Sequence, residues 1–172
     1  MGSGFGGFTN EVRTITTKHA HVHQGTMFSI SANDTALASG GTISVNILMG
    51  TRHVSIIGDF SGDKNIRGQL YEGPTMSNDG TIITPVNRNR DSTHLMQAEF
   101  WTAPTITDNG TLLSDTIAIA GKSSVGAASV ELDWALKPST RYLIMLTNLG
   151  SQAAVVQVSL FMHDELNEHK FR

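Results

Sequence analysis

The sequence predicts an all-β protein, an antiparallel and jelly-roll-like β-sandwich with an extended N-terminal arm. A repeat, the composition and the hydrophobic pattern all favour this fold class. The ten residues that begin at Pro74 recur thirty positions later, beginning at Pro104. Glycine is abundant and charged residues make up only 16% of the chain, which suits short strands and tight turns better than helices. Apolar side chains alternate with polar ones along several short segments, as in strands with one buried face.

The repeat preserves the chemistry of a turn. Asn78-Asp79-Gly80-Thr81 corresponds to Asp108-Asn109-Gly110-Thr111. Glycine accepts a positive φ without steric cost, and Asn and Asp favour turns. We therefore expect Gly80 and Gly110 to be structural turn residues at equivalent places in the sandwich. No catalytic side chain repeats with them.

Size and charge narrow the class of partner. With 172 residues the chain has the size of one domain. Its net charge of −3 gives no electrostatic reason to expect a nucleic-acid partner, and we interpret the polar run Thr84–Arg90 as a solvated loop or a subunit contact. No apolar stretch approaches the ~18 residues of a membrane span. We expect neither nucleic acid nor membrane as a partner.

Three parts of different composition follow one another. We assign residues 1–18 to a flexible arm, 19–163 to the β-sandwich domain and 164–172 to a charged C-terminal tail. The arm is rich in glycine and carries four apolar residues that we expect to be interface anchors, Phe5, Phe8, Val12 and Ile15. Fully extended, an arm of this length reaches on the order of 60 Å, which is enough to cross to a neighbouring subunit.

Ten segments of the sandwich domain have strand patterns bounded by Gly, Asn, Asp or Pro. They are 20–31, 41–49, 52–60, 65–72, 81–86, 95–102, 111–119, 129–136, 141–148 and 152–163. The last is the clearest, because Val156, Val158 and Leu160 alternate with residues of the opposite face. Four aromatic residues within these segments, which we expect to pack in the core, are Tyr71, Trp101, Trp134 and Tyr142.

Three histidines in a row are the first candidates for metal ligands. His19, His21 and His23 would project from one face of a strand. Same-face positions lie about 6.6 Å apart along a strand, whereas zinc requires donor atoms at about 2.1 Å, so three such imidazoles converge poorly. The chain has no cysteine, which removes thiolate sites and disulfides. We expect no metal here and interpret the histidines as a polar strand face or an intersubunit contact.

The other candidate catalytic or ligand-binding motifs in the sequence are incomplete. Gly121-Lys122-Ser123 resembles the end of a phosphate-binding loop, but Thr116 occupies the position that requires glycine. No nucleophile elbow is present. Asp and Asn residues in the expected loops form no calcium cage. The strand carboxylates, which no spacing rule joins into an acid/base couple, are Glu72, Glu99, Glu131 and Asp133. We expect no catalytic residues, no enzyme activity and no cofactor.

Several turn and strand segments carry a family resemblance. They are His21–Gly25, Leu70–Thr75, Thr84–Arg90, Pro104–Leu112 and, near the C-terminus, Leu136-Lys137-Pro138 with Thr140, Tyr142 and Leu143. Together they resemble the head decoration, or capsid cement, proteins of tailed bacteriophages. The resemblance runs from about His19 to His163 and leaves out the arm. It implies an all-β protein that binds the outside of an assembled capsid shell.

The resemblance therefore implies a structural virion protein. Its partners would be the major capsid protein and other copies of itself, in a dimer or trimer, and the arm anchors would lie at one of these interfaces. Such a protein is made in the host cytoplasm and ends on the outer surface of the capsid. An alternative is a head-fibre or tail-associated module that binds host glycans, which would require exposed aromatic side chains in a groove.

Overall fold

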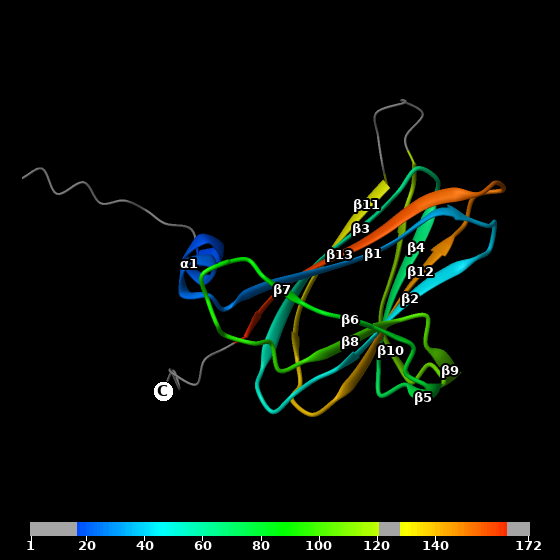
Figure 1. Cartoon of the computed structure of the whole chain (residues 1–172). Helices are drawn as coiled ribbons and strands as arrows, with labels where there is room; N and C mark the ends of the chain where they lie inside the picture. Colours follow the sequence, from blue (N-terminus) through cyan, green and yellow to red (C-terminus); the bar gives the residue numbers. More distant parts are fainter. Residues whose placement is uncertain (1–16, 121–127, 165–172) are drawn as a thin grey trace, which may run out of the picture.

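Two antiparallel sheets packed face to face form the protein in a computed structural model that describes residues 17–120 and 128–164 (Figure 1). In chain order the elements are α1 (Thr17–Gln24), β1 (Met27–Leu37), β2 (Thr42–Leu48), β3 (Val54–Gly62), β4 (Ile66–Glu72), β5 (Thr75–Asn78), β6 (Thr81–Ile83), β7 (Val86–Asn87), β8 (Glu99–Thr102), β9 (Thr105–Asp108), β10 (Thr111–Ala118), β11 (Ala128–Leu136), β12 (Arg141–Asn148) and β13 (Ala154–Asp164). The predicted all-β sandwich is confirmed. Within the described ranges, no helix has the length and apolar character needed to span a membrane.

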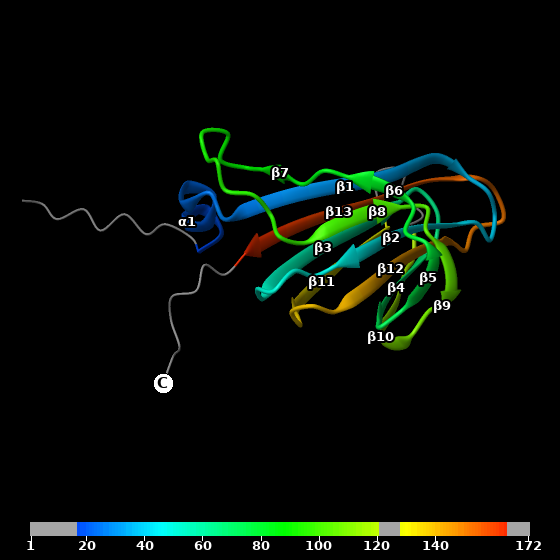
Figure 2. The same cartoon turned by 60° about the horizontal axis from the view of Figure 1, so that its bottom comes forward.

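The strands pair in a nested order. One sheet has the order β11-β3-β13-β1-β7 and the other β10-β4-β12-β2-β8-β6, while β5 and β9 form a separate pair. The first strand thus pairs with the last, β2 with β12, β3 with β11 and β4 with β10. This order is compatible with the jelly-roll-like arrangement, which stays a prediction. Figure 2 shows the two layers, with α1 at one end and the β5–β9 pair at the other.

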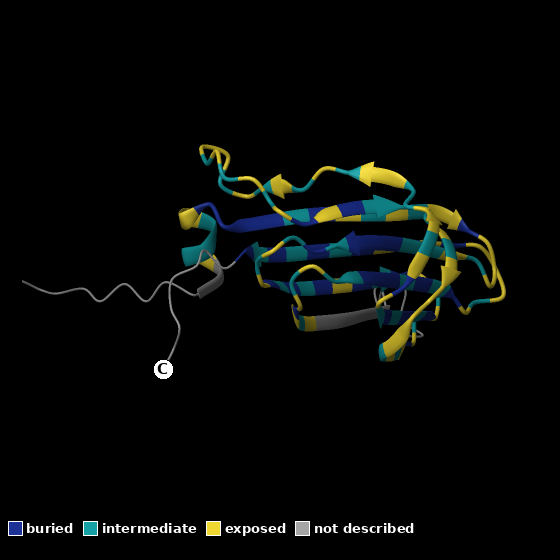
Figure 3. Cartoon of the chain, turned by 90° about the horizontal axis from the view of Figure 1, so that it is seen from below, coloured by how far each residue is buried: buried dark blue, intermediate teal, exposed yellow. Residues whose placement is uncertain are grey.

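The core lies between the two sheets. Val156, Val158 and Leu160 are buried and alternate with more exposed neighbours, which confirms the predicted alternation of the last strand. Figure 3 shows the same alternation of buried and exposed residues along other strands. Fully burying a side chain of this size contributes roughly 1.5 to 3 kcal/mol. Gly68 of β4 leaves room for the Phe60 ring, because a Cβ at that position would lie 2.4 Å from it.

The two copies of the repeat are interlaced. Each copy's strand pairs with the other copy, so that Glu72 lies opposite Thr111, and the corresponding Thr102 lies opposite Thr81. Between these pairings β5 runs antiparallel to β9, with Met76 opposite Ile106. Met76 and Ile106 occupy equivalent places in the repeat. The register therefore relates the two copies by an approximate two-fold axis that passes between these two residues.

Gly80 and Gly110 have φ angles of +101° and +80°, the backbone conformation that we expected of them. Each N–H is held by the side chain two residues earlier, Asn78 Oδ1 at 2.8 Å and Asp108 Oδ1 at 2.7 Å. A Cβ at Gly80 would lie 2.1 Å from the Thr102 carbonyl oxygen. The equivalent Cβ at Gly110 would lie 2.4 Å from the Glu72 carbonyl oxygen. Each glycine therefore lets its own copy of the repeat lie directly on the backbone of the other.

The strand predicted over 20–31 is wrong in its first half. Residues Thr17–Gln24 form α1, and β1 begins only at Met27. Gly25 ends the helix with φ +71°, its N–H bonding to the Val22 carbonyl while the Thr26 N–H bonds to the His21 carbonyl, both at 3.0 Å. These two bonds are those of a Schellman motif. The alternation of His with Ala and Val suggested a strand. It does not predict the helix, because the end of this helix is set by Gly25 and by contacts with distant residues.

The middle of the chain also departs from the predicted strands. The segment predicted as one strand over 81–86 divides into β6 and β7, which belong to different sheets. Pro85 lies between them and has no N–H to give to a ladder. The strand predicted from residue 95 begins at Glu99. The short strands β5 and β9 lie inside the repeat, where turn residues alone were expected.

Candidate functional site

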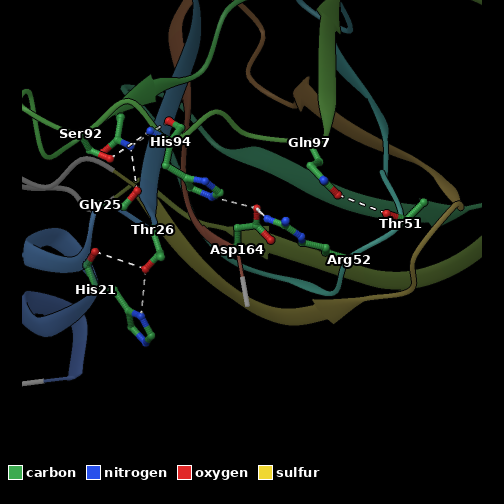
Figure 4. Close-up of polar contacts among 10 residues, drawn as sticks. His21, Gly25, Thr26, Thr51, Arg52, Ser92, His94, Gln97 and Asp164 are labelled. Atoms are coloured by element: carbon green, nitrogen blue, oxygen red, sulfur yellow. Dashed lines mark hydrogen bonds and ion pairs between the residues drawn. The ribbon is translucent and has the colours of Figure 1, made fainter. Parts of the chain in front are cut away.

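Polar side chains from four distant segments meet at the α1 end of the sandwich (Figure 4). We call this cluster the α1 junction and define it by His21, Thr26, Arg52, His94 and Asp164. His21 Nδ1 lies 3.2 Å from the Thr26 hydroxyl, and its ring stacks on His163 at the end of β13 with centroids 4.4 Å apart. The junction fixes α1 to both β1 and β13.

Two asparagines, Asn87 in β7 and Asn89 just after it, bond to the carbonyl end of α1. Asn87 donates to the Gly25 carbonyl at 2.8 Å, and Asn89 donates to the His23 carbonyl at 3.0 Å. They satisfy carbonyls at the helix end that have no partner within the helix. Gly25 also passes so close to Ser92 that a Cβ there would lie 2.2 Å from its hydroxyl oxygen. The polar run Thr84–Arg90, which we interpreted as a solvated loop or a subunit contact, therefore holds the end of α1 through Asn87 and Asn89.

Asp164 is the buried charged group of the junction. Its side chain is 0% exposed, and Oδ2 lies 3.3 Å from Arg52 Nη1 and 3.2 Å from His94 Nε2. Oδ1 has no hydrogen-bond partner among the described residues. We assigned Asp164 to the charged tail, but it is the last residue of β13, and its N–H bonds to the Thr26 carbonyl. Since a buried carboxylate needs compensation, Arg52 and His94 hold the end of this strand in place.

Apolar side chains are exposed along both edges of the sandwich. On edge strand β10 and just after it, Leu112, Ile117 and Ile119 are 47%, 56% and 75% exposed. On the opposite edge strand, β6, Ile82 is 65% exposed, and Leu95, which lies between β7 and β8, is 80% exposed. Exposed apolar edge strands favour pairing with another chain. The six-stranded sheet therefore has exposed apolar side chains on both of its edge strands, β10 and β6.

Two aromatic residues related by the repeat lie on the outer face of the six-stranded sheet. Tyr71 and Trp101 are half-buried and alternate with the core residues Leu70 and Phe100. Core packing was expected of these two and of Trp134 and Tyr142. It is found for Tyr142, which is buried, and for Trp134, which packs against the core. The guanidinium of Arg141 lies 5.9 Å from the centroid of the Trp101 ring. One face of this indole therefore already has a cationic partner.

Arg141 also binds the first turn of the repeat. It pairs with Asp79 and donates to the Oδ1 atom of the buried Asn46 at 3.4 Å. The hydrogen bond from Arg141 holds the pKa of the Asp79 carboxyl below its usual value. This link attaches the turn that contains Gly80 to the centre of the six-stranded sheet.

Among the described side chains, the strand carboxylates Glu72, Glu99 and Asp133 do not assemble into an acid/base couple, while the side chain of Glu131 lies outside the described residues. Glu72 accepts hydrogen bonds from Lys137 Nζ at 2.7 Å and from the Tyr142 hydroxyl at 3.0 Å. Lys137 lowers the pKa of Glu72, and burial raises the pKa of Tyr142. Glu99 and Asp133 are exposed on other strands. Glu72 is therefore a structural partner of two neighbouring groups.

The proposed arm anchors Phe5, Phe8, Val12 and Ile15 lie outside the described residues. Within the described ranges, no three His, Asp or Glu side chains come together as a metal-binding group. A shallow hollow lies beside Lys64 and Asn65 at the start of β4, open to solvent and bordered by Leu149. Within the described residues, neither the titratable side chains nor this hollow supplies a reactive constellation.

Sequence reasoning did not find the α1 junction. Arg52, His94 and Asp164 are separated by 42 and 70 positions and belong to no motif. No local pattern marks these residues, and Asn87 and Asn89, which hold the carbonyl end of α1, lie outside the junction. Comparisons of the sequence with protein-family models and with curated proteins find no match.

Proposed function

We propose that the protein is a structural virion protein that decorates and stabilises a bacteriophage capsid from the outside. The single observation that carries the proposal most directly is the position of the chain ends. The first described residue, Thr17, belongs to helix α1, whose His21 ring stacks on His163 near the end of β13, and Asp164 is the last residue of that strand (Figure 1). Residues 1–16 and 165–172 are therefore joined to the same end of the sandwich.

The proposed mode of action requires no chemical reaction. A protein that binds the assembled lattice and not the free capsid subunit stabilises the assembly by mass action. The apolar residues Phe5, Phe8, Val12 and Ile15 supply the anchors, and each buried Phe contributes roughly 1.5 to 3 kcal/mol before the ordering cost is subtracted. The exposed edge of β10 supplies a surface for a neighbouring copy in a dimer or trimer.

A binding experiment with purified shells tests the proposal. We expect the full-length protein to co-sediment with assembled capsids in stoichiometric amounts and not with free major capsid protein. Deletion of residues 2–12 should lower the occupancy of shells while leaving the sandwich folded by circular dichroism. A full-length variant with Phe5, Phe8 and Val12 replaced by Ser controls for arm length and should lose occupancy as well.

Two results would contradict the proposal in different ways. If neither variant binds less than the parent, the arm is passive and attachment belongs to the sandwich. If the full-length protein does not bind shells at all, the decoration role fails.

A second candidate is a module that binds host glycans. Half-buried Tyr71 and Trp101 on one outer face favour it, because sugars stack on aromatic rings. Arg141 over Trp101 argues against it, since it already contacts that ring. A glycan array with the parent protein and a Trp101→Ala variant separates the two candidates, because only a glycan-binding module gives signals that this variant loses.

A further inference from the structure

The helical fold of residues 17–24 changes what the histidines of α1 can do. His19 and His23 are four positions apart and therefore lie on one face of the helix, one turn from each other. Their ring centroids are 4.6 Å apart, with an angle of 36° between the ring planes. Both residues are exposed. His21 projects elsewhere, towards the Thr26 hydroxyl (Figure 4), and its ring stacks on His163.

This spacing matches two imidazoles on a single metal ion. A ring nitrogen about 2.1 Å from a metal places the ring centroid about 3.2 Å from it. Two such rings would then have centroids about 4.5 Å apart for a right angle at the metal and about 5.2 Å apart for a tetrahedral angle. The separation of 4.6 Å lies at the right-angle end of this range. The strand geometry that argued against a shared ion does not apply to this pair.

We propose that His19 and His23 form a two-histidine binding site for a divalent transition-metal ion, with water completing its coordination. Imidazole suits copper, nickel and zinc, whereas calcium and magnesium prefer oxygen ligands. A right angle between neighbouring ligands occurs in the square-planar and tetragonal geometries of Cu²⁺ and Ni²⁺. The order of affinity is therefore Cu²⁺ above Ni²⁺, with Zn²⁺ also below Cu²⁺.

The bound ion would join two successive turns of α1. A helix of eight residues is marginal by itself, and α1 depends on the junction and on Asn87 and Asn89 for its carbonyl end. An ion held by His19 and His23 adds a link near the amino end of α1, directly after residues 1–16 in the sequence. Metal binding would thus stabilise the helix that connects these residues to the sandwich.

Titration of the full-length, tag-free protein with Ni²⁺ and with Cu²⁺ tests the site. We expect one saturable equivalent by calorimetry, and for Cu²⁺ an electron paramagnetic resonance spectrum with nitrogen hyperfine structure. His19→Ala and His23→Ala should each weaken binding at least about tenfold, since each removes one of two protein ligands. His53→Ala is the matched control, because His53 is also exposed but belongs to the loop before β3, and it should bind as the parent does.

A second variant separates the spacing of the pair from its position. Ala20→His and Gln24→His, added to His19→Ala and His23→Ala, rebuild a pair four positions apart on α1, and this variant should regain binding. Ni²⁺ should slow amide hydrogen exchange in residues 19–25 of the parent and not of the double variant lacking both histidines. These readouts use the isolated protein and do not depend on capsid binding.

Three results would overturn the proposal. They are the absence of saturable binding, unchanged binding by the double variant, and a loss of binding in His53→Ala as large as that in His19→Ala. The double variant should keep the circular dichroism spectrum of the parent, so that a loss of binding is assigned to the two missing imidazoles and not to unfolding.

Discussion

The two ends of the sandwich are held together by different kinds of interaction. At the β5–β9 end, backbone lies directly on backbone, and the contacts depend on glycines at positive φ that occur twice, thirty positions apart. At the α1 end, the side chains of Arg52 and His94 meet at the buried Asp164 carboxylate, and His21 bonds to the neighbouring Thr26. The β5–β9 end is encoded by a short local motif, whereas the α1 end forms only when the fold brings distant residues together.

The two ends should also differ in how well they tolerate substitutions. A backbone contact leaves no space for even one added carbon, whereas a side-chain network can lose one member and relax. We therefore expect the β5–β9 end to be intolerant of small changes and the α1 end to respond to changes of charge.

The largest effect should come from a methyl group at the interlaced turns. Gly80→Ala and Gly110→Ala each force an L residue into a positive φ and place Cβ against a backbone carbonyl of the other repeat. We expect each to lower the free energy of unfolding by about 2 to 4 kcal/mol. Urea unfolding of both variants measures this. A loss below about 1 kcal/mol at both positions would mean that the turns are not closely packed.

Removal of Arg52 should have the next largest effect. Arg52→Ala leaves the buried Asp164 carboxylate with His94 as its one remaining partner in the junction. We expect a loss of about 2 kcal/mol in the free energy of unfolding, since a buried charge without its partner is costly. The double variant Arg52→Ala with Asp164→Ala should lose less than the sum of the single variants. Strict additivity would show that the two residues are not coupled.

A smaller effect should distinguish the two copies of the repeat. Gly73 and Ala103 are equivalent and both have positive φ, +70° and +52°, but Gly73 has open space where a Cβ would lie. Gly73→Ala should therefore cost about 1 kcal/mol from backbone strain alone. Ala103→Gly should gain about 0.5 kcal/mol, because relief of strain exceeds the extra entropy of the unfolded chain. Changes of equal sign in the two variants would contradict this interpretation.

The smallest effect should be a pH dependence at the link between Arg141 and Asp79. Because Arg141 lowers the pKa of Asp79 in the folded protein, the pair stabilises the fold above the unfolded pKa of about 4, and this contribution is lost as pH falls through the folded value. Arg141→Met should thus be less stable than the parent at pH 7, and the difference should shrink towards pH 2. Thermal unfolding between pH 2 and pH 7 measures it. A difference that stays constant over this range would assign the effect of Arg141 to its contact with Trp101.

Much of the sandwich could be predicted from the sequence, for local reasons. Alternation identified β13, and the turn chemistry of the repeat identified Gly80 and Gly110, because both signals lie within ten residues. β5 and β9 were missed since each is four residues long and pairs only with the other repeat. No local pattern could reveal that pairing.

Prediction of the candidate site was poorer. The histidines of α1 were assigned to a strand because they alternate with Ala and Val. Over only five residues, this pattern does not distinguish a strand from a helix. Asp164 was assigned to the tail since charged residues follow it, although it is buried. Both errors come from segments that bond to residues far away in the sequence: Asn89 is 66 positions from His23, and His94 is 70 positions from Asp164.

The place of the last strand has a consequence for the order of events during synthesis. β13 lies between β3 and β1 in the five-stranded sheet, with Met27 opposite His163 on one side and Ser55 opposite it on the other. Until residue 164 has left the ribosome, the nascent chain presents two unpaired strand edges where its central strand belongs. Such edges invite pairing with other nascent chains, and contacts so distant in sequence form slowly. Co-translational folding of this sheet is therefore expected to finish only with the last strand, and a holding chaperone should raise the yield of soluble protein.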